Sequence, residues 1–161
     1  MILKNLLSRR PELREKVFEL IDRHELLAVK DAKLLEGAAE LLGWLSSRAC
    51  LALVTLQGRR ACEELLQKRG LRRFFSACVT REDTLDRAEQ ILKAVALLGS
   101  RTQETLFVGD RVNDVVSARR AGVRVALVGR SLSGEPRPDY SFSSVRELGL
   151  FLSGRTSSGV L

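Results

Sequence analysis

The hydrophobic positions of this chain alternate between two spacings, one typical of helices and one typical of buried strands. Apolar residues recur every three or four positions from about 11 to 28, where Pro11 suits a first helical turn. They do so again from 34 to 45, although Gly37 and Gly43 interrupt that segment. Further helices are predicted at 59–68, 87–98 and 113–120, and continuous apolar runs predict strands at 50–55, 74–80, 105–109 and 123–128, with a short strand at 140–142.

This order of elements favours an α/β fold. Strands separated by helices of about ten residues require crossover connections, which are right-handed and produce a mostly parallel sheet covered by helices. The length of 161 residues suits one domain. We therefore expect a single domain over 1–152, with an N-terminal helical segment at 1–29 and a core at 30–152. The Gly-, Ser- and Thr-rich stretch 153–161 is expected to be a flexible tail.

The composition narrows the class of protein. Hydrophobic residues make up 45% and charged residues 29%, as in globular chains, and no apolar run reaches the roughly 18 residues of a membrane span. The N-terminus lacks a signal-peptide core, so a cytoplasmic protein without membrane contact is expected. Cys50, Cys62 and Cys78 have no C-x-x-C spacing and predict neither disulfides nor zinc. His24 is expected on the surface.

The net charge of +7 raises nucleic acid as a partner. The basic residues that would form the best patch are Arg59, Arg60, Lys68, Arg69, Arg72 and Arg73. Aromatic residues are only 5% of the chain, so platforms for base stacking are scarce. An Arg-rich nucleic-acid-binding module is therefore the weakest of the functions considered.

Polar residues gather where two predicted strands end. Thr55 ends the first strand and is followed by Leu56 and Gln57 at a helix start, where a hydroxyl and backbone N–H groups suit a phosphate. Asp110 ends the third strand, and Asn113 and Asp114 open the next helix. Two carboxylates and an amide oxygen suit Mg²⁺. Taken singly, each of these residues is also an ordinary helix cap. Ligands of parallel sheets bind at the carboxyl ends of the strands, which favours a site here.

The segment LFVGDRVNDVVSARRAGV, residues 106–123, resembles the fourth motif of the haloacid dehalogenase (HAD) superfamily, chiefly Mg²⁺-dependent phosphohydrolases. LALVT, ending on Thr55, is similar to the second motif, and the resemblance extends over about 30–150. It implies a three-layer α/β/α Rossmann-like fold and a phosphorylated substrate. It also implies a weak Mg²⁺ site at Asp110, Asn113 and Asp114, with Thr55 binding the transferring phosphoryl group.

Two departures from the family pattern limit what the resemblance implies. The third motif, a Lys or Arg before the fourth, has Arg81 and Arg87 as candidates, and Arg87 is preferred because it opens a helix. The first motif, an Asp-x-Asp after an N-terminal strand, supplies the nucleophile and is absent. Asp22 and Asp31 precede Thr55, but neither follows a predicted strand, and Asp31 is interpreted as a helix-start residue.

These observations leave three functions. The first is a HAD-like domain that keeps a phosphate and Mg²⁺ site but lacks the nucleophile and is inactive or incomplete, with Thr55 and Arg87 as its remaining catalytic residues. The second is an active Mg²⁺-dependent phosphatase whose first motif lies upstream or in another chain. The third is the nucleic-acid-binding module.

The absent first-motif strand also predicts a rearranged sheet. In the family this strand lies between the strands that end at Thr55 and Gly109, and leaving their backbone groups unpaired is costly. We expect the chain to close this gap itself, either with residues 1–7 as a replacement strand or by direct pairing of 51–54 with 106–108. A homodimer or a partner chain that completes the sheet is the alternative.

Overall fold

The computed structural model describes residues 2–129, 134 and 136–156. Its helices are α1 (Ile2–Arg9), α2 (Arg14–Asp31), α3 (Ala38–Ser46), α4 (Arg59–Lys68), α5 (Arg87–Leu97), α6 (Val112–Ala121) and α7 (Val145–Thr156), with short 3₁₀ turns at Pro11–Leu13, Arg72–Phe74 and Thr102–Glu104. Its strands are β1 (Ala52–Val54), β2 (Ala77–Val79), β3 (Leu106–Gly109), β4 (Arg124–Val128) and β5 (Tyr140–Phe142). The predicted α/β class is confirmed.

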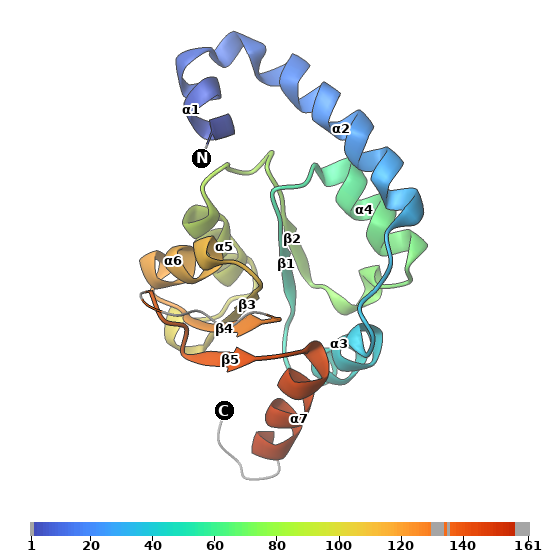
Figure 1. Cartoon of the computed structure of the whole chain (residues 1–161), viewed down its shortest axis with the longest axis vertical. Helices are drawn as coiled ribbons and strands as arrows, with labels where there is room; N and C mark the ends of the chain where they lie inside the picture. Colours follow the sequence, from blue (N-terminus) through green and yellow to red (C-terminus); the bar gives the residue numbers. More distant parts are fainter. Residues whose placement is uncertain (1, 130–133, 135, 157–161) are drawn as a thin grey trace.

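The strands form two separate parallel sheets. β1 pairs with β2, with Ala52 opposite Ala77. β3, β4 and β5 pair in that order, with Leu106 opposite Arg124. Figure 1 shows the two sheets at different orientations, with β1 and β2 seen as a long pair and β3 to β5 as a second group. Within the residues that the structure describes, no backbone ladder joins β1 to β3.

Helices cover both faces of the three-stranded sheet. α5 and α6 pack on one face, around the fully buried side chains of Val115, Val125 and Leu127. α3 and α7 pack on the other face, where Phe142 and Leu148 meet partly buried aliphatic and aromatic residues. This half of the molecule therefore has the three layers, helix, sheet and helix, that the resemblance implies.

The two-stranded sheet has a smaller core. α4 contributes Cys62 and Leu66, which pack with Leu71 against partly buried Leu53 and Cys78 of the strands. α2 contacts α4, and α5 contacts β1, β2 and α6. Figure 1 shows α1 and α2 arching over the end of β1 and β2 from which the chain leaves toward α4. α5 is thus the helix that links the two sheets.

The boundaries of several elements differ from the prediction. α3 begins only at Ala38, because Gly37 has a left-handed backbone with φ of 77° that ends the preceding segment. Asp31 is the last residue of α2, so its interpretation as a helix-start residue was wrong. α7 continues through Thr156, past the predicted tail boundary at Ser153. The rest of that predicted tail, 157–161, lies outside the described residues.

The expected closure of the sheet was also wrong. Residues 2–9 form α1 and supply no strand. The other expected route fails as well, because 51–54 and 106–108 do not pair with each other in the described part of the chain. The helical outcome has a physical reason: apolar residues of this segment recur at helical spacing in the sequence, and Leu7 is buried at 7% exposure. In the described part of the chain, β1 and β3 therefore each keep one edge without a paired strand.

Across the ranges described, none of the helices has both the length and the apolar character needed to cross a bilayer.

Candidate functional site

Thr55 lies in the turn between β1 and α4, at the carboxyl end of the strand, as predicted. Its backbone N–H donates to the Val79 carbonyl of β2 at 2.9 Å, which extends the strand pairing by one residue. Its Oγ1 accepts from the Gln57 N–H at 3.0 Å. The threonine therefore shapes the turn that contains Leu56 and Gln57, and the three predicted phosphate-binding residues of this turn do lie together.

The first N–H groups of α4 are already paired inside the protein. The Gly58 N–H donates to Glu25 Oε2 at 2.9 Å, and the Arg59 N–H donates to Glu82 Oε2 at 3.1 Å. These two carboxylates occupy the positive end of the helix, where an anion would otherwise bind. A phosphate at this turn would therefore rely on the Thr55 hydroxyl and the backbone just before Gln57.

Arg87 connects the two sheets at their carboxyl ends. It opens α5, and its guanidinium donates to the Val54 carbonyl of β1 at 3.1 Å. Its Nε lies 3.5 Å from Asp114 Oδ1 of α6. Burial lowers the pKa of Arg87 from its usual range, and the nearby carboxylate of Asp114 opposes that shift. An arginine remains protonated in this setting, so Arg87 places a fixed positive charge between β1 and β3.

Asp114 holds the turn that follows β3 in its conformation. Its side chain is buried, and Oδ2 accepts from the N–H groups of Asp110 and Arg111 at 3.3 and 3.2 Å. This arrangement caps α6. A Cβ at Gly109 would lie 2.6 Å from the Cβ of Asp114, so only glycine fits where the turn passes this carboxylate.

Asp110 and Asn113 differ from Asp114 in being exposed. The side chain of Asp110 is 70% exposed, and its nearest cation is Arg111 Nε at 3.9 Å. This carboxylate is free to take a metal, whereas the Asp114 carboxylate is committed to Arg87 and to backbone N–H groups. The side chains of the described residues nowhere gather three His, Cys, Asp or Glu groups suited to a metal. The corner fits Mg²⁺ only in part, because further oxygen ligands would have to come from water, phosphate or another segment.

Two residues near the site were not predicted to belong to it. Gln90, fully buried, donates from Nε2 to the carbonyls of Thr55 and Thr84, both at 2.9 Å. Its signal in the sequence is a polar residue on the apolar face of the helix 87–98. Arg81, considered and set aside for the third motif, is 1% exposed and contacts α2 instead of the turn at Asp110. The preference for Arg87 over Arg81 as the third-motif residue stays a prediction.

The basic patch on and after α4 is largely engaged within the protein. Arg59 pairs with Asp83 at 2.8 Å, and Arg72 pairs with Glu63 at 3.0 Å. The Arg73 guanidinium lies 4.9 Å from the centre of the Phe74 ring, and Lys68 donates to the Lys30 carbonyl. Of the six basic residues, Arg59 and Arg72 are thus paired with carboxylates of the protein itself.

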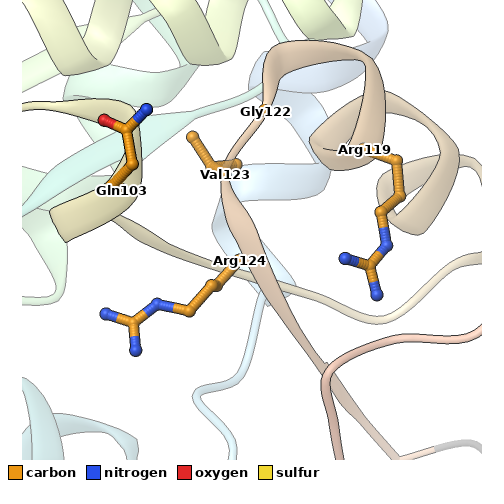
Figure 2. A pocket seen from close by; sticks show the side chains of 5 residues that line it. All are labelled: Gln103, Arg119, Gly122, Val123 and Arg124. Atoms are coloured by element: carbon orange, nitrogen blue, oxygen red, sulfur yellow. The ribbon is translucent and has the colours of Figure 1, made fainter.

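A hollow lies at the opposite end of the three-stranded sheet. It has a volume of about 400 Å³ and is lined by Gln103, Arg119, Gly122, Val123 and Arg124. Figure 2 shows the Arg119 and Arg124 side chains on either side of the segment that enters β4. This is the amino end of β4, so the hollow is separate from the site at Thr55, Arg87 and Asp110.

The chain is similar to several known proteins. A family model described as haloacid dehalogenase-like hydrolase matches residues 2–128. Pyrophosphatase PpaX of Halalkalibacterium halodurans is 34% identical over 106 residues, which are 61% of this chain and 49% of that protein. Phosphoglycolate phosphatase of Synechococcus elongatus is 34% identical over 97 residues, 60% of this chain and 46% of that protein. The chain thus spans about half the length of these curated relatives.

Solved structures share the fold. A HAD-superfamily hydrolase of subfamily IA from Geobacter sulfurreducens superposes with a TM-score of 0.69 and 28% identity, over 77% of this chain and 63% of that one. The HAD-hydrolase YfnB from Bacillus subtilis, whose structure is bound to magnesium, superposes with a TM-score of 0.67 and 22% identity, over 75% of this chain and 56% of that one. These likenesses confirm the Rossmann-like α/β fold.

Proposed function

We propose that this chain, which belongs to the haloacid dehalogenase-like hydrolase family, carries the phosphate- and Mg²⁺-binding part of a phosphohydrolase site that is incomplete without one more strand. The observation that carries the proposal is that β1 and β3 each have one edge that no strand among residues 2–129, 134 and 136–156 pairs with. The proposed site residues stand at the carboxyl ends of these two strands. The relatives named as phosphatases and a pyrophosphatase support a phosphorylated small molecule as the substrate class.

Different residues of the site bind the oxygens of a phosphoryl group, balance its charge and hold the metal ion. The Thr55 hydroxyl and the Leu56 backbone N–H bind its oxygens, while the Gln57 N–H stays with Thr55 Oγ1, and Arg87 balances the negative charge from between the strands. Asp110 and Asn113 hold Mg²⁺, while Asp114 keeps their turn and Arg87 in place. When bound, Mg²⁺ would neutralise phosphate charge at this corner.

Hydrolysis needs two further groups. Phosphoryl transfer in this family uses a carboxylate in line with phosphorus and an acid for the leaving oxygen. The aspartates before Thr55, Asp22 and Asp31, both lie on α2, and neither follows a strand. Loss of a covalent nucleophile commonly costs several orders of magnitude in rate. The chain by itself is therefore proposed to bind phosphate without turning over phosphate esters.

The alternative is an active enzyme in which an Asp-bearing strand fills the space between β1 and β3. That strand would come from a segment upstream or from a partner chain, a second copy included. It would pair with both open edges and place its carboxylates beside Thr55 and Asp110. The shorter span of this chain relative to its curated relatives supports this alternative.

Hydrolysis of p-nitrophenyl phosphate with Mg²⁺ tests the proposal. The purified chain should be no faster than its Asp110→Asn variant, while ³¹P spectra of the wild type show weak binding of inorganic phosphate. Turnover well above that of Asp110→Asn would contradict the incomplete site. A synthetic apolar peptide ending in Asp-x-Asp distinguishes the incomplete site from the active-enzyme alternative, with the same peptide ending in Asn-x-Asn as control. The alternative predicts turnover only with the Asp-x-Asp peptide.

A further inference from the structure

α2 is tied to the turn that carries Thr55 by a buried cluster of charges. Arg81 follows β2 and is 1% exposed, and its guanidinium donates to Glu25 Oε1 at 2.8 Å and to the Leu56 carbonyl at 3.3 Å. It also pairs with Asp22 of α2. The ring of Phe18, one turn earlier on α2, lies 5.2 Å from the same guanidinium. One arginine thus contacts three residues of α2 and the backbone of the turn.

Glu25 closes this cluster onto the turn itself. Its Oε1 accepts a hydrogen bond from the Arg81 guanidinium, and its Oε2 accepts one from the Gly58 N–H at 2.9 Å. The partners are separated from Glu25 by 56 and 33 residues in sequence, so the carboxylate joins three distant segments. The cluster lies tight against the turn: a Cβ on Gly58 would lie 2.1 Å from Asp22 Oδ1 and 2.6 Å from an Arg81 nitrogen, so these side-chain ends would have to shift.

We propose that Glu25, held by Arg81, is a positioning residue that sets the conformation of the Thr55–Gly58 turn from α2. The assignment rests on the proposed phosphate-binding role of that turn. Thr55 Oγ1 and Glu25 Oε2 accept from two successive N–H groups, those of Gln57 and Gly58, so the two side chains together fix the path of the backbone. Displacing Glu25 frees one of these N–H groups and loosens the other.

The functional consequence is a link between α2 and phosphate binding. α2 arches over the carboxyl end of β1 and β2 (Figure 1), and its contact with the turn passes through Glu25 and Arg81 rather than through apolar packing alone. Because Glu25 and Arg81 form this contact, a substitution of Glu25 on α2 reaches the turn directly.

Amide hydrogen exchange of the ligand-free chain, read residue by residue by NMR, tests the assignment. In Glu25→Ala the Gly58 amide should exchange at least about tenfold faster, because the substitution removes the carboxylate of α2 that accepts from it. The Gln57 amide should shift, since it reports the bond to Thr55, and the amides of β4 should keep their protection. Glu25→Gln, which retains one oxygen acceptor, should fall between Glu25→Ala and wild type.

The matched control is Glu19→Gln on the exposed side of the same helix, where Glu19 pairs only with Arg23 in the described contacts. If Glu25→Ala does not fold, Gly58→Ala is the second variant. Its added Cβ displaces the Asp22 and Arg81 side chains from the turn and should likewise speed exchange of the amide at position 58. Equal exchange in Glu25→Ala and Glu19→Gln, or faster exchange spread evenly over β4, would overturn the assignment. No phosphate is present, so failure here is distinct from failure of the proposed function.

Discussion

The two sheets of this protein are stabilised in different ways. The β3–β4–β5 half has helices on both faces and a core in which Val115, Val125 and Leu127 are fully buried. In the β1–β2 half every strand residue except the buried Val79 is of intermediate exposure, and polar links such as Arg81 to Glu25 and Asp83 to Lys93 hold its connections. Apolar burial thus dominates one half and charge pairing the other, and the open edge of β1 belongs to the half with less apolar core.

The largest expected difference between the halves comes from truncating a leucine in each. Leu127→Ala on β4 should lower the free energy of unfolding by about 3 kcal/mol, because it leaves a cavity in a closed core. Leu53→Ala on β1 should lower it by about 1 kcal/mol, because that side chain is only partly buried. Urea unfolding measures both. Equal losses would show that the two cores are equally dense.

The next effect concerns Asp83, which follows β2 and has 11% of its side chain exposed. Burial alone would raise its pKa, but the Lys93 ammonium, the Thr80 N–H and Arg59 together hold the pKa at about 2, below the ordinary 3.8. A depressed carboxyl pKa stabilises the folded state above pH 4, and that contribution disappears as the pH falls toward 2.

Asp83→Asn should therefore unfold about 2 kcal/mol more easily than wild type at pH 7, and with a much smaller difference near pH 2. Chemical denaturation across this range gives the comparison. A difference that stays constant from pH 7 to pH 2 would rule out the ion pairs as its source.

A smaller difference in stability is expected between substitutions of Asp110 and Asp114, in the turn that follows β3. Asp114→Ala should cost about 1 to 2 kcal/mol of stability, because it removes the cap of α6 and the partner of Arg87. Asp110→Ala should change stability by less than about 0.5 kcal/mol, because its side chain is exposed. Thermal unfolding of the pair, in buffer without Mg²⁺, checks this. Similar losses in both variants would contradict the division between a structural and a free carboxylate.

The last and smallest effect concerns the reactivity of two thiols of the β1–β2 half. A hydrogen bond from Cys62 lowers the pKa of Cys78 to about 7, while the same contact and burial raise the pKa of Cys62. In a Cys50→Ser background, alkylation of Cys78 by iodoacetamide should rise through pH 7, with Cys62 unreactive. Adding Cys62→Ala should move that rise to higher pH. An unchanged profile would mean that the two thiols do not interact.

Local patterns predicted most of the fold. The helix at 59–68 and the strand at 140–142 have the boundaries read from the sequence, since apolar spacing and Gly70 define them. The turns at Thr55 and Asp110 were found because short polar segments follow apolar runs. Arg87 was predicted as the charge that opens a helix, and it does open α5, with Nε 3.5 Å from Asp114; its role as the third-motif residue stays a prediction.

Contacts between distant segments could not be predicted in this way. Glu25 and Arg81 are ordinary charged residues in sequence, and their meeting at Gly58 depends on how α2 crosses the sheet. We predicted that the chain would pair the free edges of its strands, because unpaired backbone groups are costly. That prediction did not allow for Arg87, whose guanidinium donates to the Val54 carbonyl. One side chain thus satisfies a backbone group that a strand would otherwise have paired.

The open edge of β1 is the central claim, and the exchange rates of two neighbouring amides test it most directly. The Thr55 N–H donates to β2 at 2.9 Å, so the Val54 N–H, which alternates with it, faces the opposite edge. In the monomeric chain without ligand, Val54 should exchange at least about 100-fold faster than Thr55, since no strand among the residues described pairs with its amide. Comparable protection of the two amides would mean that a strand already lies between β1 and β3.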